Sequence, residues 1–196
     1  RGTKIHAQLE AYSKGGKFKE KIAPRLNYKI DNLPCFTNST ENELLKTVDK
    51  GIFPEYLIYR QSDDNILRLA GQIDLLIKNG NDIYILDYKS NEKIDLKSGF
   101  DASTKKNAMM KYPLNNIQDS NYWHYTLQLS TYAWMVQKIN PEYNIKGLSI
   151  IHYDHNDNVT TYQLDYLKSD VERMLAYYKT IRKRELAEEQ RKRIEF

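Results

Sequence analysis

The sequence predicts a mixed α/β domain. Segments with helical periodicity alternate with strand-like runs, in the order helix, strands, helix, strands, helix, and no internal repeat is present. A chain of 196 residues is long enough for one well-buried core, so a second domain is not needed. Hydrophobic residues make up 40% and charged residues 29%, which is typical of a globular protein and excludes disorder of the whole chain.

The N-terminal part contains two predicted helices. Apolar residues recur at helical spacing over residues 3–12, and Thr3 stands in the position of an N-cap. A second helix is expected over residues 39–48, closing near Gly51, because it opens with the capping sequence Ser-Thr-Glu-Asn-Glu. The stretch between them, residues 17–36, contains Pro24 and Pro34 and predicts no regular element.

The middle of the chain predicts a β-hairpin. Residues 56–60, 66–77 and 82–89 are rich in Ile, Leu and Tyr and are strand-like. The last two runs flank residues 78–81, which contain Asn79-Gly80. Asn-Gly between such runs is the strongest short-range hairpin signal.

The C-terminal half continues the alternation after a polar stretch, residues 91–120. A strong helix pattern ends before Pro141, which cannot continue a helix. The predicted elements are a helix over residues 122–139, strands over 146–153 and 159–164 around the turn 154–158, and a highly charged helix from about 169.

Charge, cysteine content and hydropathy limit the function classes. The 30 basic and 26 acidic residues give a net charge of +4, so attraction to a polyanion must come from local clusters. The 16 tyrosines mildly favour nucleic-acid binding, although tyrosine is also a common strand residue. One cysteine, Cys35, excludes an internal disulfide and any cysteine-built metal site. No apolar run approaches the roughly 18 residues that span a bilayer, so we expect a cytoplasmic protein.

The predicted hairpin brings two aspartates to one face. If Asn79 and Gly80 are its loop, Asp74 pairs with Ile85, and a four-residue loop gives the same register. Side chains alternate along a strand, so Asp74 and Asp87 then share a face. As diagonal neighbours their α-carbons would be about 7–8 Å apart, and their carboxylates could converge on one ion.

Lys89 lies on the same face, two residues after Asp87. Two carboxylates without thiolates suit Mg²⁺ or Mn²⁺ better than zinc. Such an ion polarises a phosphodiester, and a nearby lysine can hold the attacking water and offset developing charge. This arrangement predicts phosphodiester hydrolysis. The alternative is a surface ion pair at a hairpin rim, which is common for Asp-Tyr-Lys alone.

The spacing of these residues resembles the RecB-like branch of the PD-(D/E)XK nucleases. A first helix with a histidine, an acidic residue before the second strand and a Gln-x-x-x-Tyr helix accompany the two strand motifs. The matching residues are Gly2-Thr3-Lys4-Ile5-His6 with Leu9-Glu10, then Glu55, Gly71-Gln72-Ile73-Asp74, Asp87-Tyr88-Lys89 and Gln128-Leu129-Ser130-Thr131-Tyr132. The resemblance implies a restriction-endonuclease-like fold, a mixed central sheet flanked by helices. It implies a single domain over residues 1–196, with a long insertion at 91–121 and the charged helix from about 169.

The resemblance also implies roles for the site residues. Asp74 and Asp87 would bind Mg²⁺ or Mn²⁺, helped by the backbone carbonyl of Tyr88, and His6 would be an extra ligand. Lys89 would position the attacking water. These are the catalytic and metal-binding residues that the family predicts.

Gln128 and Tyr132 lie four residues apart on one helical face, separate from the apolar face that contains Leu129. By the residues alone they could equally be a half-buried pair packed on the sheet. The resemblance implies that Gln128 orients Lys89 or the metal-bound water, and that Tyr132 contacts a DNA phosphate.

The insertion departs from the family because the connection from Lys89 to Gln128 is unusually long. It contains Lys105, Lys106 and Lys111. It could touch a DNA strand at the mouth of the site, with Lys105 and Lys106 binding DNA, or it could be a decoration; both interpretations stay open. The segment after it is similar to nucleases of bacteriophages that infect gut bacteria. The iron–sulfur cysteines of some relatives are absent, which excludes that subfamily.

Three other groups of polar residues are interpreted as structural. Asp154, His155 and Asp157 form a turn-like sequence rather than a metal site. His124 and His152 are ordinary half-buried residues. The basic residues of the C-terminal helix are interleaved with glutamates, which indicates a solvated or partner-facing helix rather than a DNA-binding stripe.

The function implied is a metal-dependent deoxyribonuclease, an exonuclease of DNA processing, recombination or replication. Its substrate would be single-stranded DNA or duplex ends, a helicase or another replication protein is a candidate partner, and the location would be the cytoplasm of a bacterium or phage-infected host. The alternative is an inactive nucleic-acid-binding or structural module of a larger phage protein. The intact set of Asp74, Asp87 and Lys89 argues against that alternative.

Overall fold

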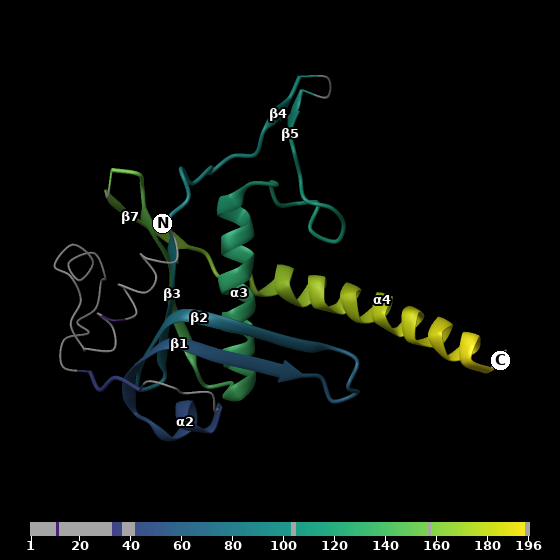
Figure 1. Cartoon of the computed structure of the whole chain (residues 1–196), viewed down its shortest axis with the longest axis horizontal. Coiled ribbons are helices and arrows are strands. Elements are labelled where there is room, and N and C mark those ends of the chain that lie inside the picture. The colour runs from purple at the N-terminus through teal and green to yellow at the C-terminus, as the bar shows by residue number, and fades with distance from the viewer. Residues whose placement is uncertain (1–10, 12–32, 37–41, 103–104, 157, 195–196) are drawn as a thin grey trace.

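A five-stranded mixed sheet forms the centre of the fold (Figure 1). The computed structural model describes residues 11, 33–36, 42–102, 105–156 and 158–194. Strand order is β1-β2-β3-β6-β7, and only the β3–β6 pair is parallel. The strands are β1 (Lys50–Gln61), β2 (Arg68–Asn79), β3 (Asp82–Lys89), β6 (Asn144–Tyr153) and β7 (Val159–Leu164). The mixed central sheet expected from the sequence is therefore confirmed.

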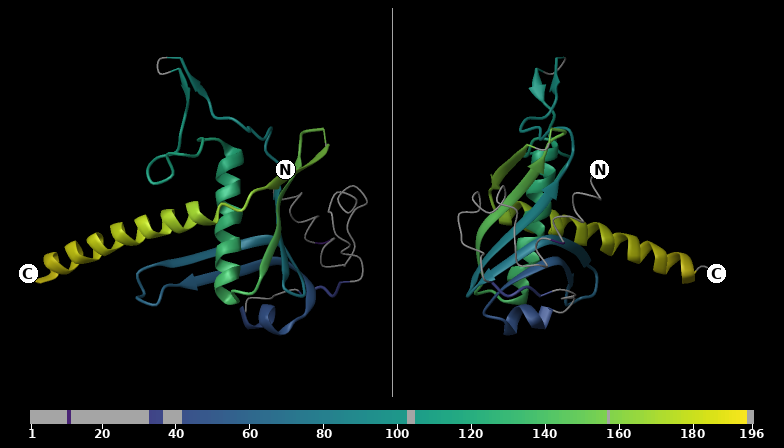
Figure 2. Two further views of the ribbon diagram at one scale, coloured as in Figure 1. Left: turned by 180° about the vertical axis from the view of Figure 1, so that it is seen from behind. Right: turned by 60° about the vertical axis from the view of Figure 1, so that its left-hand side comes forward.

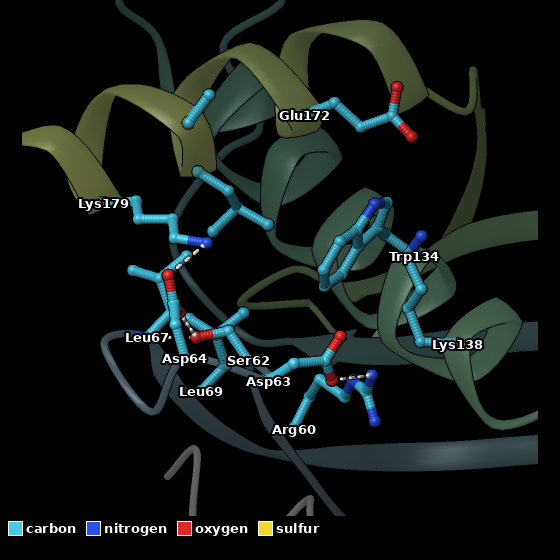
Figure 3. Close-up of a pocket in the computed structure, with 12 residues that line it drawn as sticks. Arg60, Ser62, Asp63, Asp64, Leu67, Leu69, Trp134, Lys138, Glu172 and Lys179 are labelled. Atoms are coloured by element: carbon cyan, nitrogen blue, oxygen red, sulfur yellow. Dashed lines mark hydrogen bonds and ion pairs between the residues drawn. The ribbon is translucent and has the colours of Figure 1, made fainter.

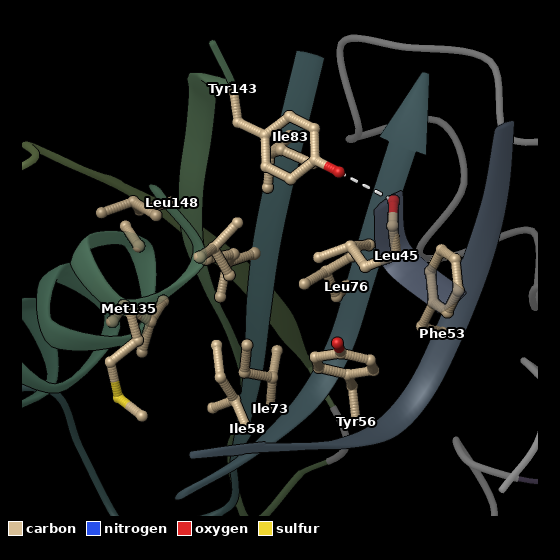
Figure 4. Close-up of a cluster of buried hydrophobic side chains, with 14 of the residues drawn as sticks. Leu45, Phe53, Tyr56, Ile58, Ile73, Leu76, Ile83, Met135, Tyr143 and Leu148 are labelled. Atoms are coloured by element: carbon tan, nitrogen blue, oxygen red, sulfur yellow. Dashed lines mark hydrogen bonds between the residues drawn. The ribbon is translucent and has the colours of Figure 1, made fainter. Parts of the chain in front are cut away.

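Helix α3 (Asn121–Ile139) connects β3 to β6 and packs on one face of the sheet. A crossover of this kind is needed because parallel neighbours cannot be joined by a tight turn. Leu129, Ala133 and Val136 recur at helical spacing and are fully buried against the sheet, as their pattern predicts. The short helix α2 (Asn42–Thr47) adds Leu45 to the same core, whose carbonyl accepts a 2.8 Å hydrogen bond from Tyr143 (Figure 4).

The observed bounds depart from the predicted ones mainly around Gly51. We predicted that Gly51 closes a helix, but β1 already begins at Lys50 and Gly51 is buried within it. A Cβ at this position would come within 2.6 Å of the Phe36 ring, so the strand needs a residue without a side chain here. The predicted helix over residues 3–12 lies outside the described residues, apart from Ala11, which is helical.

The sheet forks between β2 and β3. Strand β2 pairs with β1 along its length, but with β3 only from Leu75 to Asn79. In Figure 1, β1 and β2 run across the view at the level of the lower half of α3, whereas β3 runs up it. Glu55 of β1 lies at this bend with a φ of 50°, a left-handed conformation that is unusual for a residue with a side chain.

The insertion forms a small hairpin with a packed base. Its strands are β4 (Phe100–Asp101) and β5 (Lys106–Asn107), which pair antiparallel and project beyond α3 (Figures 1 and 2). Farther along, Met110, Leu114 and Ile117 are buried against Leu127 of α3. The insertion is thus anchored on the domain rather than being a loose loop.

Helix α4 (Lys168–Ile194) packs on the domain through its first half and extends away from it (Figures 1 and 2). Val171 and Leu175 are buried. Lys179 forms a 2.7 Å ion pair with Asp64 in the β1–β2 turn, and this hydrogen-bonded contact lowers the pKa of Asp64 to about 2. Within the described part of the chain, no helix is long and apolar enough to cross a membrane.

Candidate active site

Asp74 and Asp87 face each other where β2 leaves β3. The hairpin loop is Gly80 and Asn81, because Asn79 pairs with Asp82. Continued past the last pair, Leu75 with Leu86, this register places Asp74 opposite Asp87. The Asp74 carboxylate accepts a hydrogen bond from the N–H of Tyr88, the residue that follows Asp87, so it lies beside this part of β3.

The predicted register was therefore wrong by two residues. Ile85 pairs with Leu76, not with Asp74. Gly80 has a φ of 61°, so it takes the first loop position, which in this class of turn requires the left-handed conformation that glycine adopts without strain. A shift of two residues preserves the alternation of faces, and the predicted sharing of one face by both aspartates is unaffected.

The carboxylate of Asp74 is held by the backbone of β3. Its Oδ2 accepts a hydrogen bond of 2.8 Å from the Tyr88 N–H. Because β2 has diverged from β3 at this level, the Tyr88 N–H donates to the side chain of Asp74 rather than to a backbone carbonyl of β2. The orientation of this carboxylate is thus set by the fork.

Lys89 is held between Asp87 and an aromatic ring of α3. Its Nζ forms an ion pair with the Asp87 carboxylate and lies 4.7 Å from the centre of the Tyr125 ring. The side chains of Lys89 and Asp87 are only 20% and 4% exposed, so this pair is largely shielded from water. An ammonium over an aromatic face is attracted by the ring quadrupole, which restrains Lys89.

Tyr125 was not among the residues singled out from the sequence. It precedes Gln128 by three residues, so both lie on the same face of α3. That spacing was available as a signal, but only the fold shows that this face of α3 looks onto Lys89.

Gln128 and Tyr132 are joined to each other and to Gly71 of β2. Gln128 Nε2 donates a 3.1 Å hydrogen bond to the Tyr132 hydroxyl. The Tyr132 ring lies on Gly71, where an added Cβ would collide with ring atom Cε1. The Tyr132 ring therefore packs in the space that the missing side chain of Gly71 leaves free. This contact joins the part of β2 that diverges from β3 to α3.

We expect Gly71→Ala to reduce activity by about 10- to 100-fold, the usual cost of disturbing a residue that supports a metal-site side chain. The new methyl group displaces the Tyr132 ring and with it Gln128, and the overpacking destabilises the fold by about 1–3 kcal/mol. Turnover and melting temperature should be measured together.

Gly99→Ala is the matched control for the melting temperature, because a Cβ at Gly99 meets no atom within 4 Å. Wild-type turnover and melting temperature in Gly71→Ala would show that Tyr132 is not seated on this glycine.

The other predicted site residues are placed differently. His6 and Glu10 lie outside the described residues. Glu55 occupies the β1 position opposite Asp74, since Pro54 pairs with Leu75 and Tyr56 with Ile73. Among the residues that the structure describes, no three His, Cys, Asp or Glu side chains are grouped closely enough to hold a metal ion.

His152 has a closer relation to the site than the sequence indicated. It is buried on β6 in the position that pairs with Lys89, and its Nε2 is 2.7 Å from the carbonyl oxygen of Asn91. The side chain anchors the start of the insertion. No sequence signal links His152 to Asn91, because they are far apart along the chain.

The groups interpreted as structural have local partners. Asp154 accepts hydrogen bonds of 2.8 and 2.9 Å from the N–H groups of Asn156 and Asn158, and hydrogen bonding with Asn158 lowers its pKa. His124 pairs with Asp119 at 2.7 Å on the surface. These contacts account for Asp154 and His124, and Asp157 lies outside the described residues.

The DNA-binding candidates Lys105 and Lys106 are not brought to the aspartates. Both are exposed on the β4–β5 hairpin, which projects away from the sheet (Figure 2).

A cavity of about 480 Å³ lies elsewhere, between the β1–β2 turn, α3 and α4 (Figure 3). Trp134, Leu67 and Leu69 line it together with charged residues. At its rim Lys179 is paired with Asp64, and Arg60 is 3.7 Å from Asp63. None of the predicted catalytic residues lines this cavity, so it is separate from the candidate site.

The chain is similar to known proteins over nearly its whole length. A family model described as the PD-(D/E)XK nuclease superfamily matches residues 1–195. Among solved structures, the crystal structure of SSO0001 matches with a TM-score of 0.46 and 12% identity, over 92% of this chain and 58% of that one. No curated protein matches significantly. Since this family model matches nearly the whole chain, the chain belongs to the PD-(D/E)XK nuclease superfamily.

Proposed function

We propose that the protein is a metal-dependent deoxyribonuclease whose active site is Asp74, Asp87 and Lys89. The observation that supports this most is the fork, where the Asp74 carboxylate is held on the Tyr88 N–H and the neighbouring Asp87 is ion-paired to Lys89. Membership of a nuclease superfamily implies a nucleic-acid substrate. We propose DNA as that nucleic acid.

The donor set fits a hard divalent cation. Asp74 and Asp87 offer carboxylate oxygens, and the described part of the chain places no thiolate beside them. We assign Mg²⁺ or Mn²⁺ to these two residues, with the Tyr88 carbonyl and His6 as further donors. When bound, the cation supplies charge stabilisation for the phosphodiester and lowers the pKa of a water molecule.

Lys89 holds the attacking water and balances the negative charge that develops on the phosphate. Its restraint between Asp87 and Tyr125 preorganises the ammonium for this role. Gln128, hydrogen-bonded to Tyr132, orients Lys89 or the water, and the Tyr132 hydroxyl contacts a phosphate of the DNA. Tyr125, Gln128 and Tyr132 share one face of α3 by their spacing, and Tyr125 on that face covers Lys89.

Within the superfamily we assign the chain to the RecB-like branch, on the motifs Gly71-Gln72-Ile73-Asp74, Asp87-Tyr88-Lys89 and Gln128 to Tyr132. An exonuclease of DNA processing, recombination or replication follows, acting on single strands or duplex ends in a bacterial or phage-infected cytoplasm. A helicase or other replication protein is its candidate partner, and a phage is its candidate source.

The test is incubation with end-labelled linear DNA and with closed circular DNA, in Mg²⁺, in Mn²⁺ and in EDTA. We expect linear DNA to be degraded with either metal, the circle to survive and EDTA to stop the reaction. Cutting of the circle would replace exonuclease with endonuclease. No cleavage in any metal, together with a melting temperature indifferent to Mn²⁺, would indicate an inactive nucleic-acid-binding module instead.

A further inference from the structure

The insertion presents an exposed surface that combines aromatic, apolar and basic side chains. We call residues 96–111 the arm; it includes β4 and β5. Leu96, Phe100 and Met109 are 54%, 66% and 43% exposed. The arm contains four lysines and one aspartate in sequence. Large apolar side chains that are exposed together on a segment projecting from the domain indicate a surface that meets a partner.

Two of these apolar side chains share a face of the arm. Phe100 and Asn107 are cross-strand partners, so their side chains lie on the same side. Met109 follows Asn107 by two residues and lies on that side as well, since the Ala108 N–H donates to the Gly99 carbonyl at 2.9 Å and continues the ladder. The face therefore consists of an aromatic ring, an amide and a thioether.

The base of the arm is fixed to the catalytic part of the fold. The Ser98 N–H donates to Gln118 Oε1 at 3.1 Å, and the Asp95 N–H donates to Asn121 Oδ1 at 2.7 Å. Asn121 is the first residue of α3, about 6 Å along the helix from Tyr125, which covers Lys89. The arm thus stands at a set position beyond the end of the active site (Figures 1 and 2).

We propose that the arm binds single-stranded DNA beside the active site, with a base stacked on Phe100 and with Lys105 and Lys106 on its phosphates. The proposal rests on the nuclease function and names the substrate of that site. Lysines alone would serve a duplex equally well, but an exposed ring can stack only on a base that is not paired and covered. The excess of lysine favours a polyanion over an apolar protein segment.

The test uses the full-length chain with Asp87→Asn, in Ca²⁺, and measures fluorescence anisotropy of a labelled oligothymidylate and of a blunt duplex of equal length. We expect Phe100→Ala to weaken single-strand binding about 10-fold, from the usual contribution of one stacked base, and duplex binding less than twofold. Phe100→Trp should bind like wild type, and Phe100→Leu should bind like the alanine variant. Tyr59→Ala, an aromatic 61% exposed on β1, is the matched control and should bind normally.

The lysines have a separate readout. Replacing Lys105 and Lys106 with glutamine should lower the slope of log affinity against log salt by about 1.4 for a single strand, from about 0.7 per phosphate contact, whereas Phe100→Ala should leave the slope unchanged. An unchanged slope in the double variant would remove the lysines from the interface.

The outcomes for the arm and for catalysis are distinguishable. The substrate bis(p-nitrophenyl) phosphate is too small to reach the arm from the active site. Its rate of hydrolysis in Mn²⁺ should therefore be the same in Phe100→Ala and in the wild type. Equal loss of single-strand and duplex binding, or no loss, would overturn the arm proposal while leaving the nuclease intact. Phe100-dependent binding in a protein that hydrolyses neither the diester nor DNA would uphold the arm and overturn the nuclease.

Discussion

Asp74→Asn and Asp87→Asn are each expected to abolish DNA cleavage, by more than the roughly 100-fold that loss of a supporting residue costs a metal site. Each change removes one anionic oxygen donor without changing side-chain volume. The asparagine at position 74 can still accept the hydrogen bond from the Tyr88 N–H, so the fork should remain folded. Cleavage rates on linear DNA and circular dichroism spectra measure the two effects.

Thermal unfolding adds a second readout for the same variants. Without metal, Asp74→Asn should melt at or above the wild-type temperature, because one of two neighbouring negative charges is gone. Asp87→Asn should melt below the wild-type temperature, because it also removes the shielded ion pair with Lys89. With Mn²⁺, only the wild type should be stabilised. Asp82→Asn is the matched control: it lies at the opposite end of β3 and should behave as the wild type in both measurements. Retained cleavage in both position-74 and position-87 variants would reject the site.

Lys89→Ala is expected to lower turnover by about 100- to 10,000-fold, the range for a group that moves or holds a proton in the reaction. Its Nζ contacts the Asp87 carboxylate and the Tyr125 ring, and we assign it to the water and the phosphate rather than to the cation. Metal affinity should therefore change far less than turnover. Single-turnover rates and calorimetric Mn²⁺ titration separate the two quantities.

Lys93→Ala is the control for this variant, because Lys93 is 74% exposed and pairs only at the surface with Asp95 at 3.0 Å. It should cleave at the wild-type rate. A Lys89→Ala protein that turns over normally but binds Mn²⁺ poorly would assign Lys89 to the metal site instead.

Local patterns were sufficient to locate most elements. β3 and β7 have the predicted bounds, and α3 begins one residue before the predicted helix, at Asn121. Alternation and helical spacing are properties of residues that are close in the sequence, so they predict an element without knowledge of the rest of the fold. Gly51 shows the limit of this reasoning, because its role depends on the Phe36 ring, which packs on it from another segment.

The local sequence pattern did not predict the register of the β2–β3 hairpin correctly. Asn79-Gly80 suits a type I′ loop and Gly80-Asn81 suits a type II′ loop, so the composition of this segment admits both registers. The choice moved Asp87 from a diagonal position to one directly opposite Asp74. It could not move either aspartate to the other face, since the two registers differ by an even number of residues.

By itself, the sequence determined the α/β class, the motif residues and the sharing of a face by Asp74, Asp87 and Lys89, because these follow from periodicity and spacing within short segments. Three features were decided only by the tertiary structure: the hydrogen bond from the Tyr88 N–H to Asp74 at the fork, the packing of Tyr132 on Gly71, and the exposure of Phe100. Each of these joins or exposes residues whose neighbours are distant in the chain. Such contacts depend on how whole elements pack, and that packing is set by the entire core rather than by the residues that meet there.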